Sequence, residues 1–236
     1  MSPTPPMPLV LMYHSVDHYT EDPHLVTVSP QRFERQMRWL VARGLRGVST
    51  RELLAAQDAG STRGLVGLTF DDGYADFASR AVPLLLRLGF TATVYAVTER
   101  LGSHNAWDDG PRKPLMTPEQ LVAVHGAGME VASHGQWHVK LPEVPAAELE
   151  TELTASRAAL EKIIDAPVDG FAYPYGDAGD REIAAVAAAG YDHAVAIAPH
   201  APGRHALART YIGERDSWLR LHAKLRRHEL RWKARV

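Results

Sequence analysis

The sequence has 236 residues, of which 45% are hydrophobic and 23% are charged, and its formal net charge is −2. These values are typical of a globular protein with one large or two small domains, and the whole-chain charge gives no reason to expect nucleic acid or another polyanion as partner. The chain contains no cysteine, which excludes disulfides, thiolate metal sites and a cysteine nucleophile.

The N-terminal segment Met1–Pro8 contains four prolines and no basic residue. The apolar run that follows it is too short for a signal or transmembrane segment. We therefore expect a cytoplasmic protein.

Short apolar runs alternate with longer helix-like stretches along the chain, which is typical of βα units and a largely parallel sheet. The apolar runs predict strands at Leu9–Tyr13, Leu45–Val48, Leu65–Phe70, Thr91–Val97, Met129–Ala132, Val168–Ala172, Ala194–Ile197 and Leu207–Tyr211. Helix start and stop residues predict helices over 30–42, 117–125, 146–164 and 180–189. No linker or repeat interrupts this pattern, so we expect one domain over residues 1–236.

The C-terminal segment, about 215–236, is rich in arginine and lysine with leucines and a tryptophan between them. This pattern predicts a basic amphipathic helix that packs on the domain with a solvated charged face. Contact with a membrane surface or with a partner is the alternative.

Two adjacent carboxylates, Asp71 and Asp72, follow the predicted strand Leu65–Phe70 directly. At the end of a buried strand they can bind a cation, take a proton, or divide these roles, and Gly73 allows a sharp turn behind them. A loop in which one aspartate caps the next helix is the alternative.

Two histidines, His134 and His138, lie four residues apart after the predicted strand Met129–Ala132. On one helical turn, this spacing places both imidazoles on the same side, where they can bind one metal ion. A single pair of this kind is weak by itself, because 12 histidines produce such spacing by chance. Together with one of the two aspartates, the pair predicts an open site for a catalytic divalent metal.

Two further segments end predicted strands. Phe171–Gly176 places Tyr175 in a tight loop whose backbone N–H groups could face a developing oxyanion, or which is a plain turn. Leu11–His14 is an apolar strand that runs into a histidine, which alone would be a buried packing residue. Because the carboxyl ends of the strands of a parallel barrel share one rim, we expect all these residues to meet at one mouth.

The four segments together resemble the motifs of the polysaccharide deacetylase family, the NodB-homology domain, over nearly the full length of the chain. They are Thr69–Gly73, His134–His138, Tyr173–Gly176 and Leu11–His14. The Leu-x-x-His motif comes last in most members and first in this chain, as in the circularly permuted branch that includes poly-N-acetylglucosamine deacetylases. The resemblance implies an α/β fold, a distorted (β/α) barrel with about seven parallel strands, which agrees with the strand count.

The resemblance also implies roles for individual residues. It makes Asp71 the general base, His14 the general acid, and the backbone amide of Tyr175 a donor to the oxyanion hole. The implied cofactor is a divalent metal, with zinc expected and cobalt or nickel as alternatives. Its ligands would be Asp72, His134 and His138. The candidates for the substrate groove are Tyr173, Pro174, Trp107 and Trp137, with buried packing as the alternative for either tryptophan.

Two positions depart from the family pattern. Ala172 stands where the family often has an arginine that orients the catalytic carboxylate, so another group must hold Asp71. Gly135 stands where a serine or threonine hydroxyl usually braces the metal-binding loop. The aromatic motif that walls the acetyl pocket in the family has no evident counterpart.

The resemblance implies metal-dependent removal of N-acetyl groups from a poly- or oligosaccharide that contains N-acetylglucosamine, or from a related glycosylated precursor. The partner is thus a carbohydrate, and no nucleic acid is expected. Two alternatives remain open: hydrolysis of another small amide, such as a formyl group or cyclic imide, on the same metal site, and an inactive relative that only binds carbohydrate.

Overall fold

A computed structural model of the chain describes residues 7–233. Most of the N-terminal segment Met1–Pro8 and the last three residues of the predicted C-terminal helix therefore lie outside the described residues. The strands are β1 (Val10–Tyr13), β2 (Ser15–Val16), β3 (Thr27–Val28), β4 (Arg46–Val48), β5 (Leu65–Phe70), β6 (Thr93–Ala96), β7 (Glu130–Ser133), β8 (Gly170–Ala172), β9 (His193–Ala196) and β10 (Leu207–Tyr211). All eight predicted strands are present, whereas the two-residue strands β2 and β3 were not predicted.

Seven strands close into a parallel barrel. The order β1-β10-β9-β8-β7-β6-β5 returns to β1 through the pairing of Val10 with Gly67 and Tyr13 with Phe70. The short strand β4 pairs with the first half of β5, beside the segment that leads into β6. The predicted distorted (β/α) barrel with about seven parallel strands is confirmed.

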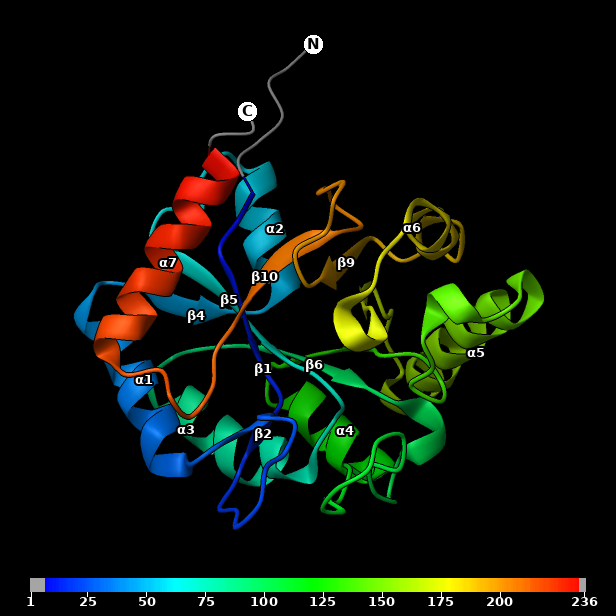
Figure 1. Ribbon diagram of the computed structural model, residues 1–236, viewed down its shortest axis with the longest axis horizontal. Coiled ribbons are helices and arrows are strands. Elements are labelled where there is room, and N and C mark those ends of the chain that lie inside the picture. The colour runs from blue at the N-terminus through cyan, green and yellow to red at the C-terminus, as the bar shows by residue number, and fades with distance from the viewer. Residues whose placement is uncertain (1–6, 234–236) are drawn as a thin grey trace.

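Helices surround the barrel on its outer side (Figure 1). They are α1 (Pro30–Ala42), α2 (Thr50–Asp58), α3 (Val82–Arg87), α4 (Pro118–Gly126), α5 (Ala146–Ile164), α6 (Asp180–Ala188) and α7 (Trp218–Lys233). Four single turns complete them: the π-turn η1 (Phe77–Ala81) and the 3₁₀ turns η2 (Thr98–Arg100), η3 (Leu141–Glu143) and η4 (Pro174–Gly176). Among the described helices, none combines the length and hydropathy that crossing a bilayer requires.

The helix starts follow the capping signals in the sequence. The Ser29 hydroxyl accepts a hydrogen bond from the Arg32 N–H at the start of α1, and Thr117 and Gln120 form both bonds of a capping box at the start of α4. The C-terminal helix begins at Trp218 and not near 215, because Asp216 accepts hydrogen bonds from the Gly213 N–H and from Lys224 and so holds the preceding residues in a loop.

Alternate residues of each strand face the helices or the barrel axis. Side chains from five neighbouring strands form one apolar layer inside the barrel: Tyr95, Ala132, Ala172, Val195 and Leu207. The larger core lies between the outer face of the strands and the helices, and includes Leu68, Phe70 and Phe171. The apolar interior layer separates polar groups at the two ends of the barrel.

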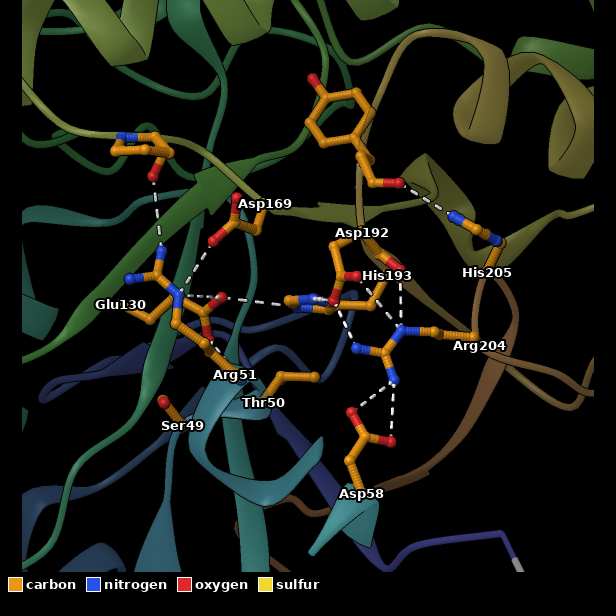
Figure 2. A network of polar contacts seen from close by, with 12 residues as sticks. Ser49, Thr50, Arg51, Asp58, Glu130, Asp169, Asp192, His193, Arg204 and His205 are labelled. Atoms are coloured by element: carbon orange, nitrogen blue, oxygen red, sulfur yellow. Dashed lines mark hydrogen bonds and ion pairs between the residues drawn. The ribbon is translucent and has the colours of Figure 1, made fainter. Parts of the chain in front are cut away.

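Figure 2 shows the polar network near the end of the barrel where β7, β8 and β9 begin. The Glu130 carboxylate accepts hydrogen bonds from the Thr93 hydroxyl at 2.7 Å and from the Arg51 backbone N–H at 2.9 Å. Its other oxygen lies 3.4 Å from Nε2 of His193, which is fully buried. Arg51 also lies 3.2 Å from the Asp169 carboxylate. This network ties α2 to the starts of the strands.

We expect the stability conferred by His193 to be lost in acid. Burial lowers the pKa of His193 below its ordinary value despite the opposing effect of Glu130. Because the pKa of His193 is lower in the folded than in the unfolded protein, acid protonates the unfolded state first. The contribution of His193 to the free energy of unfolding is therefore fully present above about pH 6.5 and is lost as the pH falls. In urea unfolding, the free-energy difference between wild type and His193→Asn should therefore shrink on acidification, by at most about 1.4 kcal/mol per pH unit. Parallel pH curves for the two proteins would contradict this prediction.

Candidate metal centre and active site

The predicted site residues meet at the carboxyl ends of the barrel strands. Asp71 and Asp72 follow β5, His134 follows β7, and His14 follows β1. All four line one cavity of about 260 Å³, together with His138 and Tyr175. The prediction that these side chains share one mouth is confirmed.

Three of the cavity residues form a compact set of metal-ligating groups. One ligand atom each from Asp72, His134 and His138 lies within 4.8 Å of the others, and all three side chains are buried. Oδ1 of Asp72 is 3.4 Å from Nε2 of each histidine. Burial raises the pKa of Asp72, but hydrogen bonds with the two histidines outweigh this effect and hold the pKa well below its usual range. Asp72 is therefore ionised, as a metal ligand must be.

The backbone adopts rare conformations at this set. Asp72, His138 and Tyr175 have φ angles of +71°, +62° and +60°, in the left-handed region that non-glycine residues seldom occupy. Gly73 has a φ of +73°, and a Cβ there would lie 3.2 Å from the Ala96 backbone. Strain of this kind costs about 1–3 kcal/mol per residue and is concentrated at functional sites.

Hydrogen bonds orient His134, the first of the two candidate metal histidines, and its loop. Nδ1 of His134 contacts the Ala172 carbonyl oxygen at 2.8 Å, which leaves Nε2 facing Asp72. The Glu152 carboxylate of α5 accepts hydrogen bonds from the backbone N–H groups of Gln136 and Trp137. A Cβ at Gly135 would lie 2.9 Å from this carboxylate. Glu152 thus braces the loop in which Gly135 replaces the serine or threonine usual in the family, and no pattern in the sequence indicated this role.

Aromatic rings hold His138, the second candidate metal histidine. Nδ1 of His138 is buried and has no hydrogen-bond partner among residues 7–233. Its ring stacks on Trp107, with centroids 4.4 Å apart and an interplanar angle of 21°, and Tyr175 contacts it edge-on at 4.7 Å. The Tyr175 hydroxyl donates a hydrogen bond to Asp108, next to Trp107. The long loop 98–116 therefore supports a candidate metal ligand.

We expect Trp107→Leu to weaken metal binding about tenfold, because changes in the groups that orient metal ligands cost roughly 10–100-fold in affinity. Competition with a fluorescent zinc chelator measures the effect without any assay of turnover. Trp137→Leu is the matched control, since Trp137 is 46% exposed and contacts Arg100 outside this cavity. Equal zinc affinities for the two variants would show that the stack does not support His138.

A buried arginine holds the other aspartate. The Arg209 guanidinium, from β10, contacts both carboxylate oxygens of Asp71, at 2.5 and 2.7 Å. Burial raises the pKa of Asp71, but Arg209, with His134, outweighs this effect and holds the pKa below its ordinary value. The group that compensates for Ala172 is therefore Arg209. In the sequence, the only indication of this role was that Arg209 is a charged residue within the predicted strand Leu207–Tyr211.

His14 completes the polar wall of the cavity. Its Nε2 lies 4.0 Å from Oδ2 of Asp71, the oxygen that also accepts a hydrogen bond from Arg209. His24 and Ile197 also line the cavity and were not predicted.

The predicted groove residues divide into two groups. Trp107 lines the cavity, as Tyr175 does. Tyr173 and Pro174 are buried, and the Tyr173 hydroxyl donates to the His205 carbonyl oxygen. Neither of them, nor Trp137, is among the described residues that line the cavity.

Comparisons with known proteins agree with this geometry. The sequence model of the polysaccharide deacetylase family matches residues 58–194, more than half of the chain. The Bacillus subtilis polysaccharide deacetylase-type protein YxkH is 26% identical over 83% of this chain and 66% of its own length. A Staphylococcus aureus poly-β-1,6-N-acetyl-D-glucosamine N-deacetylase is 23% identical over 72% of this chain and 61% of its own length. The chain thus spans somewhat less than two thirds of these curated relatives.

Among solved structures, the Streptococcus pyogenes deacetylase PplD in complex with acetate superposes with a TM-score of 0.82. It is 25% identical, and the match covers 94% of this chain and 99% of that one. IcaB from Ammonifex degensii has the same fold, with a TM-score of 0.75 and 21% identity over 93% of this chain and 97% of its own.

Proposed function

Because the chain belongs to the polysaccharide deacetylase family, we propose that it removes N-acetyl groups from a poly- or oligosaccharide that contains N-acetylglucosamine, or from a related glycosylated precursor. The observation that carries this proposal is the convergence of Asp72, His134 and His138 beside an Asp71–Arg209 pair and a histidine in one cavity. Metal ligands, a base and an acid are the groups that hydrolysis of an amide needs.

The donor set suits a divalent metal, zinc above all, with cobalt or nickel as alternatives. Two imidazoles and one carboxylate leave further coordination positions open, and the hydrogen bond on Nδ1 of His134 fixes the tautomer that binds through Nε2. A bound divalent metal polarises an amide oxygen and lowers the pKa of a coordinated water.

Asp71 is the group we assign as general base. It lies beside the ligand set, and its low pKa keeps it ionised and able to accept the proton of the attacking water. The two contacts from Arg209 fix the plane of the carboxylate, which a single hydrogen bond would leave free to rotate.

His14 and Tyr175 act on the later stages of the reaction. His14, whose Nε2 lies 4.0 Å from Asp71, gives a proton to the departing amine, which is otherwise a very poor leaving group. The backbone N–H of Tyr175, in the strained turn at the cavity wall, is the donor that we assign to the tetrahedral oxyanion.

The experiment that tests this function is product release from a panel of substrates. The zinc-loaded protein is incubated with β-1,4- and β-1,6-linked N-acetylglucosamine oligosaccharides, with the monosaccharide, and with a formamide and a cyclic imide. We expect acetate from the oligosaccharides. Turnover of only the small amides would replace this function with the second candidate, and binding of oligosaccharides without any product would indicate an inactive relative.

A further inference from the structure

A second cavity, of about 610 Å³, lies between the segment after β2 and the first turns of α7. Tyr19 and Tyr211 contribute aromatic rings to its lining. The segment 22–27 forms a wall between this cavity and the catalytic one: Leu25 lines the larger cavity, whereas His24 and Val26 line the catalytic cavity. A chain of sugars longer than the catalytic cavity would therefore have this second cavity beside it.

Basic side chains of α7 form one stripe along the larger cavity. Arg220, Lys224 and Arg227 follow each other at helical spacing, and all three line the cavity with Arg215. A further cavity of about 220 Å³ shares Tyr211, Lys224 and Arg227 with it and also has Arg231 in its lining. The stripe thus continues along the helix from one cavity to the next.

The carboxylates of the larger cavity are already engaged. Asp22 accepts hydrogen bonds from the N–H groups of Val26 and Thr27. Glu214 accepts from Ser29 and lies 3.8 Å from Arg32, and Asp216 accepts from Lys224.

The arginines of the cavity differ from these carboxylates and from Lys224. Within residues 7–233, no ion pair joins Arg215, Arg220 or Arg227 to a carboxylate. The lining of the cavity has four basic side chains against three carboxylates, an excess of positive charge in a chain whose formal net charge is −2.

The geometry points to an anionic glycan as the substrate class: we infer that the larger cavity and the stripe bind carboxylate or phosphate groups on the saccharide whose acetyl group lies in the catalytic cavity. This inference rests on the proposed deacetylase function. Arginine binds carboxylate and phosphate through planar paired hydrogen bonds, and tyrosine rings pack against sugars. The arginines line concave surfaces, which suit a saccharide chain better than a flat bilayer.

Isothermal titration of the zinc-loaded full chain tests the inference with three hexasaccharides of the same backbone. They are chitohexaose, its 6-O-carboxymethyl derivative and its 6-O-phosphoryl derivative. We expect at least one anionic form to bind about threefold to tenfold more tightly than the neutral form, as partly screened charged contacts would give. The preference should decrease with added salt. The derivative that binds with the higher affinity identifies the anionic group that the cavity prefers.

Two neighbouring arginines provide the variants. Arg227→Gln removes a residue of the stripe, and we expect it to lose most of the preference for the anionic saccharide. Arg226→Gln removes the same charge from the same helix, but Arg226 pairs with Glu229 and lines neither cavity, so this variant should keep the preference.

Equal affinities for neutral and anionic saccharides, or equal losses in the two variants, would overturn the inference. Binding of wild type but not Arg227→Gln to phosphatidylglycerol vesicles, without a preference among the saccharides, would also overturn it, in favour of a membrane contact. Acetate release is measured separately. Its absence for every saccharide would count against the deacetylase function, while the titrations would still decide whether the cavity binds anionic glycans.

Discussion

The Asp71→Asn variant is expected to retain its metal and to lose roughly 10²–10⁴ in kcat, the range for removal of a positioned general base. Asparagine has nearly the shape of aspartate but cannot accept a proton at neutral pH. The metal should stay because the proposed ligand atoms belong to Asp72, His134 and His138.

Zinc content and acetate release, measured on the same preparation, separate the roles of the two aspartates. Asp72→Asn is the matched comparison, since the same substitution one residue later should weaken metal binding. The loss of charge beside Arg209 also leaves a buried guanidinium unpaired. Thermal unfolding must therefore show that Asp71→Asn is folded at the assay temperature. A folded, zinc-loaded Asp71→Asn protein with kcat within a few-fold of wild type would place the base elsewhere.

The His14→Ala variant is expected to keep its metal and fold and to lose roughly 10²–10⁴ in kcat on N-acetyl substrates. A general acid must be protonated while the base is not, so kcat/KM of the wild type should be bell-shaped in pH, and the variant should have a flattened alkaline limb.

The substrate supplies the control for His14. An activated aryl acetate has a leaving group that needs no proton, so the loss caused by His14→Ala should be much smaller with the ester than with the amide. Wild-type rates on the amide, or loss of zinc from the variant, would contradict the assignment and make His14 a packing or ligand residue.

Much of the site could be predicted because β-strands that run in parallel end at the same rim. Each motif in the sequence followed an apolar run, and the alternation of runs and helices indicated parallel strands. The positions of Asp71, His134 and His14 then followed from chain direction alone. The closure of the barrel between β1 and β5 brings His14 to Asp71, although the two are far apart in sequence.

The supporting groups could not be predicted from the sequence, since they depend on side-chain contacts between distant segments. Arg209 approaches Asp71 from β10, where nothing local marks an arginine as a partner of an aspartate 138 positions away. The contacts of Glu152 with the metal loop depend on how α5 packs, and the Trp107 stack depends on the path of a long loop. Tyr173 illustrates the opposite limit: its place in a motif suggested the groove, but its ring packs on Phe171 in the core.

In the proposed mechanism, Asp72, His134 and His138 hold one divalent metal on which acetate release depends. The most direct test determines zinc per chain by elemental analysis and acetate release from an N-acetylglucosamine oligosaccharide, for wild type and His134→Ala side by side. We expect about one zinc per wild-type chain, loss of turnover on chelation with recovery on zinc or cobalt addition, and little zinc and no turnover in His134→Ala. Equal zinc content in the two proteins, or undiminished acetate release by chelated wild type, would contradict the account.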